Sequence, residues 1–351
     1  MSKETKKKTS PKSENDYLKY SVGTDISKDK FDACISMIDR EQRVKVVATR
    51  VFKNSLVGFN EFYKWQQSIC KLSLPVVFAM EATGVYYEQL AWFLHRKELF
   101  LSVILPNKSK RYMQSLGIKS KNDKIDAKGL SRMAAEQRLE RWVAPSEAIV
   151  ELRSITRHRE SLQGSRTRFN NQLSALRSGE FVNESVESDL LDMISLLDKQ
   201  IKRTEKLIVE QLKSDKELKE GSEIITEIKG VSSVSAATVL AETNCFEMFT
   251  NQNQLTSYAG YDVIENQSGK HVGKTKISKK GNAHIRRIMH MPALNVVTFG
   301  EPVFVNLYER VYARSKIKMK GYVAVQRELL CLMYTLWKKK EKYDREYYLR
   351  A

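Results

Sequence analysis

Apolar residues alternate with other residues along three successive segments near the start of the chain, and this period of two restricts the segments to β-strands. The segments cover residues 17–26 (YLKYSVGTDI), 31–39 (FDACISMID) and 43–52 (RVKVVATRVF). Turn-forming residues separate them, so we predict a meander of three antiparallel strands. Helical and strand patterns then follow in turn. We expect helices at 56–69, 85–97 and from Lys108 onward, and strands at 75–82 and 99–106.

The predicted order β-β-β-α-β-α-β-α is typical of an RNase H-like domain. Such a domain has a mixed sheet that begins antiparallel, continues parallel and carries helices on its faces. Its first and fourth strands are adjacent, so residues at the ends of these two strands lie together. We assign this α/β domain to residues 18–145, after a basic tail at 1–17 that we expect to be disordered.

Residues 146–221 are long, charged and helical in pattern. Apolar residues recur there with the 4-3 spacing of a coiled coil, at Leu190, Ile194, Leu197, Ile201 and Ile208. Residues 178–185 (SGEFVNES) indicate a turn between two antiparallel helices. A heptad pattern does not distinguish a partner helix in the same chain from one in another chain. Both a helical spacer and a dimerisation arm therefore remain open.

Residues 222–351 are expected to form a mainly helical domain. It begins with two short helices around a glycine-containing turn, in 224–243 (IITEIKGVSSVSAATVLAET). This segment resembles a helix-hairpin-helix, whose turn amides bind a DNA phosphate, but Ser232 replaces the usual second glycine. A plain helical hairpin is the alternative. A polar loop at 262–280, a basic helix at 281–297 and a terminal helix at 322–340 follow.

The chain is strongly basic, and this narrows the partners it can have. Its 351 residues include 60 Lys and Arg against 42 Asp and Glu, so the formal charge is +18. Such a charge favours a polyanion, either nucleic acid or an anionic membrane. No apolar run approaches the roughly 20 residues that span a bilayer, and no signal peptide is evident. The four cysteines have no metal-binding spacing. We therefore predict a nucleic-acid-binding protein of the cytoplasm; the family resemblance described below implies that this cytoplasm is bacterial and that the protein is associated with the nucleoid.

Four carboxylates interrupt this basic sequence at positions that the predicted fold brings together. Asp25 lies at the end of the first strand and Glu81 at the end of the fourth. Asp123 and Asp126, three positions apart where a helix begins, share one helical face. Grouped carboxylates repel one another and require cations between them. We therefore predict two Mg²⁺ ions about 4 Å apart, or Mn²⁺ in their place, acting on a phosphodiester.

The residues around these carboxylates resemble the DEDD signature of the insertion-sequence 110 family of transposases. The matching stretches are GTDISKDKFD around Asp25, MEATGVYY around Glu81 and KNDKIDAK around the aspartate pair. SYAGY, QSG, ISKKGNAHIRR and MPAL continue the resemblance in order toward the carboxyl terminus, so that it covers about Tyr20 to Lys340. The amino-terminal domain of this family resembles the Holliday-junction resolvase RuvC.

The resemblance implies a mechanism and partners that composition alone does not. It assigns Ser268, in ENQSGKHVGK, as a nucleophile that forms a phosphoserine link with DNA. By itself, a serine before a glycine is typical of a turn. Family members act as homo-oligomers, here a dimer or tetramer, on donor and target DNA that pair with a structured bridge RNA. The residues before the serine, Val263 to Glu265, depart from the family's proline and basic pattern.

Lysines and arginines near both groups are expected to bind nucleic-acid phosphates. They are Lys119, Lys121, Lys124 and Lys128 beside the aspartate pair, and Lys274, Lys276, Lys279, Lys280, Arg286 and Arg287 after the serine. A solvated basic surface without a ligand is the alternative for the second group.

Three functions fit these observations. The chain is interpreted as a transposase or recombinase of a mobile element. The first alternative is a RuvC-like nuclease that resolves DNA junctions with metal-activated water and does not use Ser268. The second is a non-catalytic nucleic-acid-binding protein.

Overall fold

The computed structural model describes residues 16–117, 122–264, 267–268, 271–273 and 276–346. It divides the chain into two units, Met1–Ala144 and Pro145–Ala351. The amino-terminal tail predicted to be disordered lies, except for its last two residues, outside the described part of the chain.

The first unit contains a five-stranded mixed sheet, in the strand order β3-β2-β1-β4-β5. β1 (Tyr17–Ile26), β2 (Lys30–Asp39) and β3 (Val44–Lys53) are antiparallel. β4 (Val76–Glu81) pairs in parallel with β1, and β5 (Phe100–Ile104) pairs in parallel with β4. This is the RNase H-like arrangement predicted from the pattern of the sequence, and β1 and β4 are neighbours as expected.

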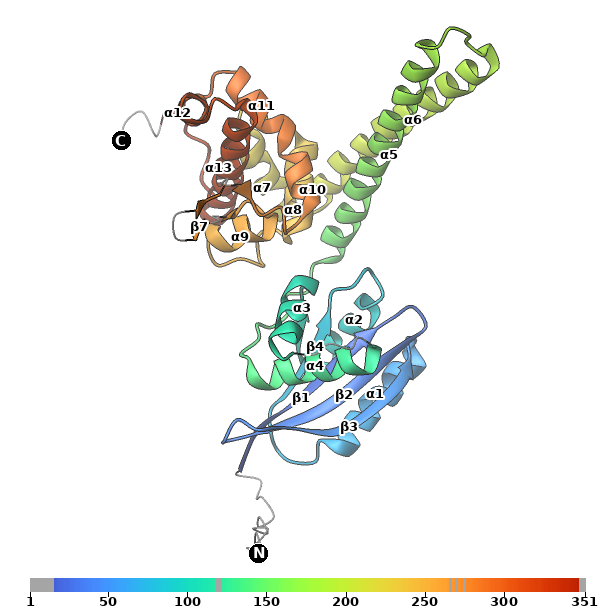
Figure 1. Cartoon of the computed structure of the whole chain (residues 1–351), viewed down its shortest axis with the longest axis vertical. Helices are drawn as coiled ribbons and strands as arrows, with labels where there is room; N and C mark the ends of the chain where they lie inside the picture. The colour runs from blue at the N-terminus through green and yellow to red at the C-terminus, as the bar shows by residue number, and fades with distance from the viewer. Residues whose placement is uncertain (1–15, 118–121, 265–266, 269–270, 274–275, 347–351) are drawn as a thin grey trace, which may run out of the picture. The chain divides into compact units, whose positions relative to one another are not determined.

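Helices cover both faces of this sheet (Figure 1). Aromatic and aliphatic side chains of α1 (Leu56–Ile69) and α2 (Glu88–Arg96) form one core with β1 to β5. On the other face, α3 (Pro106–Ser115) and α4 (Asp123–Glu136) enclose a smaller core with β4 and β5. The helix expected from Lys108 onward begins at Pro106 and ends at Ser115, and Gly117 follows with a positive φ of 68°.

α4 lies directly against the backbone of β1 at Gly23. A Cβ atom at this position would come within 2.1 Å of the Ser131 nitrogen and 2.3 Å of the Ala127 oxygen. The Ser131 hydroxyl donates hydrogen bonds to the Ser21 carbonyl oxygen at 3.0 Å and the Ser36 hydroxyl oxygen at 2.8 Å. Glycine and small polar residues thus allow helix and sheet to make backbone contact.

The second unit begins with a long helical hairpin, α5 (Glu147–Arg177) and α6 (Glu184–Ser214), each of 31 residues. Its turn lies where residues 178–185 predicted it. Arg159–Glu205, Arg166–Asp198 and Arg177–Glu187 ion pairs join the two helices. The heptad residues of α6 therefore have a partner helix within the same chain.

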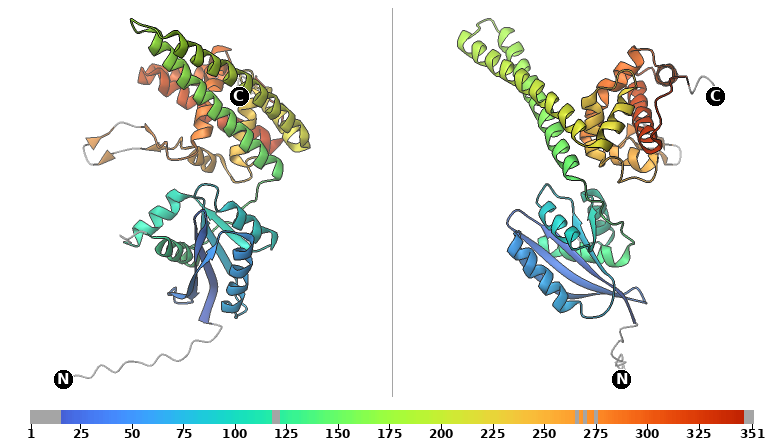
Figure 2. Two further views of the ribbon diagram at one scale, coloured as in Figure 1. Left: turned by 90° about the vertical axis from the view of Figure 1, so that its right-hand side faces the viewer. Right: turned by 180° about the vertical axis from the view of Figure 1, so that it is seen from behind.

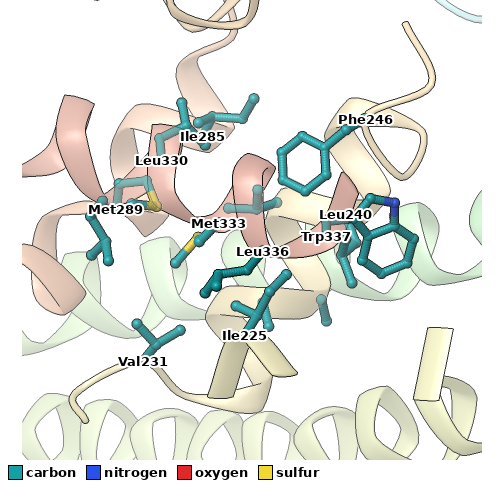
Figure 3. Packing of buried hydrophobic residues seen from close by; sticks show 14 of the residues in the cluster. Ile225, Val231, Leu240, Phe246, Ile285, Met289, Leu330, Met333, Leu336 and Trp337 are labelled. Atoms are coloured by element: carbon teal, nitrogen blue, oxygen red, sulfur yellow. The ribbon is translucent and has the colours of Figure 1, made fainter. Parts of the chain in front are cut away.

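Seven shorter helices form the body of this unit, with the hairpin extending from it (Figure 2). They are α7 (Lys216–Thr226), α8 (Ser233–Thr243), α9 (Gln252–Ala259), α10 (Ala283–Ile288), α11 (His290–Thr298), α12 (Pro302–Ser315) and α13 (Lys318–Lys339). Their core centres on Trp337, Phe246 and Leu240 (Figure 3). Trp337 packs so closely on Gly221 that a Cβ there would lie 1.9 Å from its ring.

Two helix predictions in this unit need correction. The single basic helix expected at 281–297 is broken at Met289, which ends α10 and precedes α11. Pro292 occupies the third position of α11, where its missing N–H is tolerated because first-turn amides lack helical partners. The terminal helix begins at Lys318, four residues earlier than expected. Within the described residues, no single helix has the length and hydropathy to cross a membrane, although the bent pair Ala283–Thr298 and Pro302–Ser315 meets both criteria together.

The contact at Gly23 predicts that even one methyl group there is harmful. Gly23→Ala should lower stability by about 1–3 kcal/mol, because α4 must move away from β1. Urea unfolding, with hydrogen exchange of β1 and α4 as the local readout, measures this. Gly129→Ala is the matched control, since its Cβ would meet only the flexible Met113 side chain. Equal unfolding midpoints for wild type and Gly23→Ala would contradict the described contact.

Candidate active site

Asp25 and Glu81 lie side by side at the ends of neighbouring strands. The parallel register pairs Thr24 with Met80, so the next residues along β1 and β4 are these two acids. The Glu81 carboxylate is held in place on both oxygens. One accepts a hydrogen bond from the Thr83 hydroxyl at 2.8 Å, and the other from the Ser109 hydroxyl at 2.5 Å.

Asp123 and Asp126 occupy the first turn of α4, as the sequence predicted. Asn122 begins this helix, and its side-chain oxygen accepts a hydrogen bond from the Ile125 amide at 2.9 Å. The positive end of the helix dipole favours carboxylates at this position. An Asp123 oxygen lies 3.7 Å from the Lys30 ammonium nitrogen, and both side chains are about half exposed.

The four predicted carboxylates converge on Asp25. Burial, followed by the negative charges of Asp126, Asp123, Glu81 and the neighbouring Asp32, raises the pKa of Asp25 to about 6. Every member of the DEDD set is therefore close enough to influence the ionisation of one carboxyl group. This clustering depends on the close approach of α4 to β1, since Ala127, beside Asp126, contacts Gly23.

Asp32 is an acid of this site that sequence reasoning missed. It lies opposite Asp25 in the antiparallel register of β1 and β2, and is 8% exposed. Burial and the charge of Asp123 raise its pKa, while Lys30 and Lys124 act in the opposite direction. The short turn between the two predicted strands was the signal available, because it fixes which residues face each other.

The donor set is of the kind that divalent cations prefer, since Mg²⁺ and Mn²⁺ bind carboxylate oxygens. Among the described residues, no three acidic, histidine or cysteine side chains are arranged closely enough to hold an ion together. Mutual repulsion explains why free carboxylates remain apart. The carboxylate chemistry of the donor set is what fits a divalent ion, and the pKa of Asp25, raised by burial and then by its acidic neighbours, agrees with such a group.

Some of the predicted basic residues surround this group. Lys124 and Lys128 are exposed on α4. Lys119 and Lys121 lie outside the described residues. Lys30, which was not predicted, places a further cation beside Asp123.

Ser268 belongs to the second unit, in a narrow two-stranded segment that extends from the helical body (Figure 2). β6 (Val263–Ile264) pairs with β9 (Lys276–Ile277), and β7 (Gln267–Ser268) pairs with β8 (His271–Val272). Ser268 is opposite His271 in this register. We call residues 262–278 the serine hairpin.

Backbone hydrogen bonds fix the base of the serine hairpin. They join residues in and next to the SYAGY motif, which precedes the hairpin, to residues of the ISKKGNAHIRR motif, which follows it. The Ser278 amide donates to the Asp262 oxygen at 2.7 Å, and the Lys279 amide donates to the Gly260 oxygen at 3.1 Å. The Asn282 amide donates to the Tyr258 oxygen at 2.7 Å. SYAGY and ISKKGNAHIRR therefore act together as the anchor of the hairpin.

An ion pair with a buried carboxylate is connected to this anchor. Glu242 of α8, 1% exposed in its side chain, accepts hydrogen bonds from the Arg157 guanidinium at 2.7 and 3.0 Å. The Asn282 side chain donates to the same carboxylate at 2.7 Å. Burial opposes ionisation of Glu242, but Arg157 and Asn282 more than compensate, so its pKa is lowered. The network joins α5, α8 and the start of α10.

The remaining basic residues predicted to bind nucleic acid differ in their surroundings. Lys276, Lys279 and Lys280 are exposed, whereas Lys274 lies outside the described residues. Arg286 donates to the Ala259 oxygen at 2.7 Å, and Arg287 forms an ion pair with Glu160 of α5. The two arginines thus contribute to packing around the anchor, a role that their basic surroundings in the sequence did not indicate.

Two family models match the chain. A transposase model for the IS110 DEDD domain matches residues 22–181, and a model described as transposase IS116/IS110/IS902 family matches residues 222–309. Together they account for more than half of its length. The chain belongs to the IS110 family of transposases.

Two known proteins are similar to this transposase over almost its whole length. The pilin gene-inverting proteins of Moraxella bovis and Moraxella lacunata are each 26% identical to it over 328 residues, or 92% of this chain and 97% of the relative. A solved structure of T. thermophilus RuvC with a Holliday junction substrate matches 33% of this chain and 93% of its own, with 10% identity and a TM-score of 0.25. Because that score is low, the fold assignment rests on the strand order instead.

The raised pKa of Asp25 predicts a specific dependence of stability on pH. The unfolded state has the ordinary carboxyl pKa, so between about pH 4 and pH 6 the folded state binds more protons at this residue. Metal-free protein should therefore lose stability as pH rises through this window, and no further loss from Asp25 should follow above it. Thermal unfolding in EDTA should show this slope reduced in Asp25→Asn. Identical slopes for the two proteins would contradict the raised pKa.

Proposed function

We propose that this transposase cuts and exchanges DNA strands by transesterification, with a metal-bound carboxylate site and Ser268 as the nucleophile. The clustering of Asp25, Glu81, Asp123 and Asp126 is the observation that carries the proposal. Five acids in a chain of charge +18 require a function, because ordinary folding gains nothing from their mutual repulsion. The relatives named as pilin gene-inverting proteins support strand exchange, since inversion of a gene requires cutting and rejoining DNA.

The carboxylates each have a defined part in this proposal. Divalent ions, when bound, activate an attacking oxygen and stabilise the leaving oxygen of a phosphodiester. Thr83 and Ser109 orient Glu81 through its two oxygens. Lys30 partly neutralises Asp123.

The lysines exposed around the site and after the serine hairpin are proposed to bind phosphates of the substrate strands. Lys124 and Lys128 serve the carboxylate site, and Lys276, Lys279 and Lys280 serve the hairpin.

In the proposed chemical step, the Ser268 Oγ forms a bond to phosphorus. The bond between phosphorus and one deoxyribose oxygen breaks, and that oxygen leaves with a proton. The proton of the serine hydroxyl passes to solvent. Each phosphodiester that is lost is replaced by a phosphoserine ester, so a free hydroxyl of another strand can reverse the step without an external energy source.

A structured guide RNA and a homo-oligomer, dimer or tetramer, complete the proposal. The resemblance to the family supports both, and the charge of +18 supports binding of a second polyanion besides DNA. A junction-resolving nuclease remains the alternative, because the carboxylate site could activate water without the serine.

Ser268→Ala separates these functions. Wild-type protein, incubated with Mg²⁺, flanking RNA of the element and labelled DNA, should form a covalent adduct that resists denaturant. Ser268→Ala should form none while still binding nucleic acid, because it lacks only the attacking oxygen. Ser214→Ala, at an exposed serine at the end of α6 in the same unit, is the control and should form the adduct. Normal cutting by Ser268→Ala without any adduct would establish the nuclease instead.

Asp25→Asn and Glu81→Gln test the carboxylates of the proposed site. Each should reduce strand cleavage at least about a hundredfold, because losing a group that merely orients a metal ligand already costs about 10- to 100-fold. Gel assays of labelled DNA measure cleavage, and circular dichroism checks that the fold is retained. Cleavage by both variants at the wild-type rate would rule out the metal site.

A further inference from the structure

The buried position of Asp32 is the observation that the four-carboxylate scheme does not explain. Asp32 lies opposite Asp25, in the second residue pair from the turn between β1 and β2, and is more than nine-tenths buried. Directly opposed residues of antiparallel strands point to the same face of a sheet. That face is the one α4 covers, because Gly23, two residues before Asp25, contacts the backbone of α4.

Asp32 has no neutralising partner in the part of the chain that the structure describes. No described residue donates a hydrogen bond to its side chain, and no cation lies within ion-pair distance. Lys30, on the same strand, forms its ion pair with Asp123 instead. Burying a carboxylate without hydrogen bonds or a counterion is strongly unfavourable. A buried polar side chain on this face usually has a hydrogen-bond partner. Ser36, for example, is neutral and is hydrogen-bonded to Ser131.

Two acids and two lysines lie around Asp32, and the acids are those of the proposed site. Asp25 faces it from β1, and Asp123 influences it from α4. Lys30 and Lys124 are the nearby cations, and both are exposed to solvent. A carboxylate aimed into an acidic cluster therefore adds to repulsion in the free protein. The same charge becomes favourable once a cation is bound, because it strengthens the electrostatic attraction.

We propose that Asp32 is a fifth carboxylate of the metal site, which increases its affinity for divalent cations by interacting with the bound ion. The inference rests on the proposed function of the four other acids. It also accounts for the charge of the site, since two divalent ions and Lys30 together neutralise five carboxylates. Asp32 is thus a source of instability in the free protein and of affinity in the metal-bound one.

Asp32→Asn tests this inference because it removes the charge and keeps the shape. In EDTA, the variant of the full chain should melt at a higher temperature than wild type, since a buried uncompensated charge is gone. Titration with MnCl₂, followed by calorimetry and by electron paramagnetic resonance of free Mn²⁺, should show affinity about tenfold weaker than wild type. The stabilisation that Mn²⁺ produces should be smaller in the variant, because the stabilisation from ligand binding to the folded state grows with the logarithm of the affinity.

Asp29→Asn is the matched control, because it makes the same change at an exposed position in the turn of the same β-hairpin. It should bind Mn²⁺ as wild type does. Asp25→Asn, measured in parallel, separates this inference from the proposed function. If Asp25→Asn weakens binding and Asp32→Asn does not, Asp32 is not part of the site, although the site itself stands. If wild type binds no Mn²⁺, both ideas fail.

Discussion

The backbone contact between α4 and β1 at Gly23 determines most of what the amino-terminal unit can do. A helix that packs on a sheet through large side chains stays about 10 Å from it, whereas here helix and strand backbones nearly touch. Only this proximity brings the first turn of the helix down to the strand ends where Asp25 and Glu81 lie. Ser131 then secures the contact through hydrogen bonds to Ser21 and Ser36. The acidic site is a consequence of helix packing.

The packing also creates an electrostatic problem that the fold relieves only in part. The positive end of the α4 dipole stabilises the carboxylates of Asp123 and Asp126, and the ammonium group of Lys30 also stabilises Asp123. Neither reaches Asp25, whose pKa burial and its acidic neighbours raise to about 6. A cation that binds among these carboxylates would relieve their repulsion, and this relief would contribute to the free energy of binding. In the proposed function, the same repulsion that opposes folding of the free protein favours the binding of divalent ions.

Much of the amino-terminal unit could be predicted because its signals are local and strong. Alternating strands and terminal acids identified the sheet order and four carboxylates, with Asp25 and Glu81 adjacent in the resulting register. Asp32 was missed because its segment reads as an apolar strand, and an acid inside such a strand attracts no notice until the register is known. For Arg286 and Arg287, phosphate binding stays a prediction. Their contacts with Ala259 and Glu160 could not be predicted, because these partners are distant in sequence.

The two units position their candidate catalytic residues, the carboxylates and Ser268, in different ways. The carboxylates are carried on regular elements, so the main chain of β1, β4 and α4 determines their positions. Ser268 belongs to the serine hairpin, whose base is held by backbone hydrogen bonds from Lys279 to Gly260 and from Asn282 to Tyr258. The side chain of Asn282 also binds the buried carboxylate of Glu242, so that the hairpin's base is tied to an ion pair with α5. The base of the hairpin therefore depends on a polar network around the buried carboxylate of Glu242, and such networks hold one geometry because alternatives leave a buried charge unpaired.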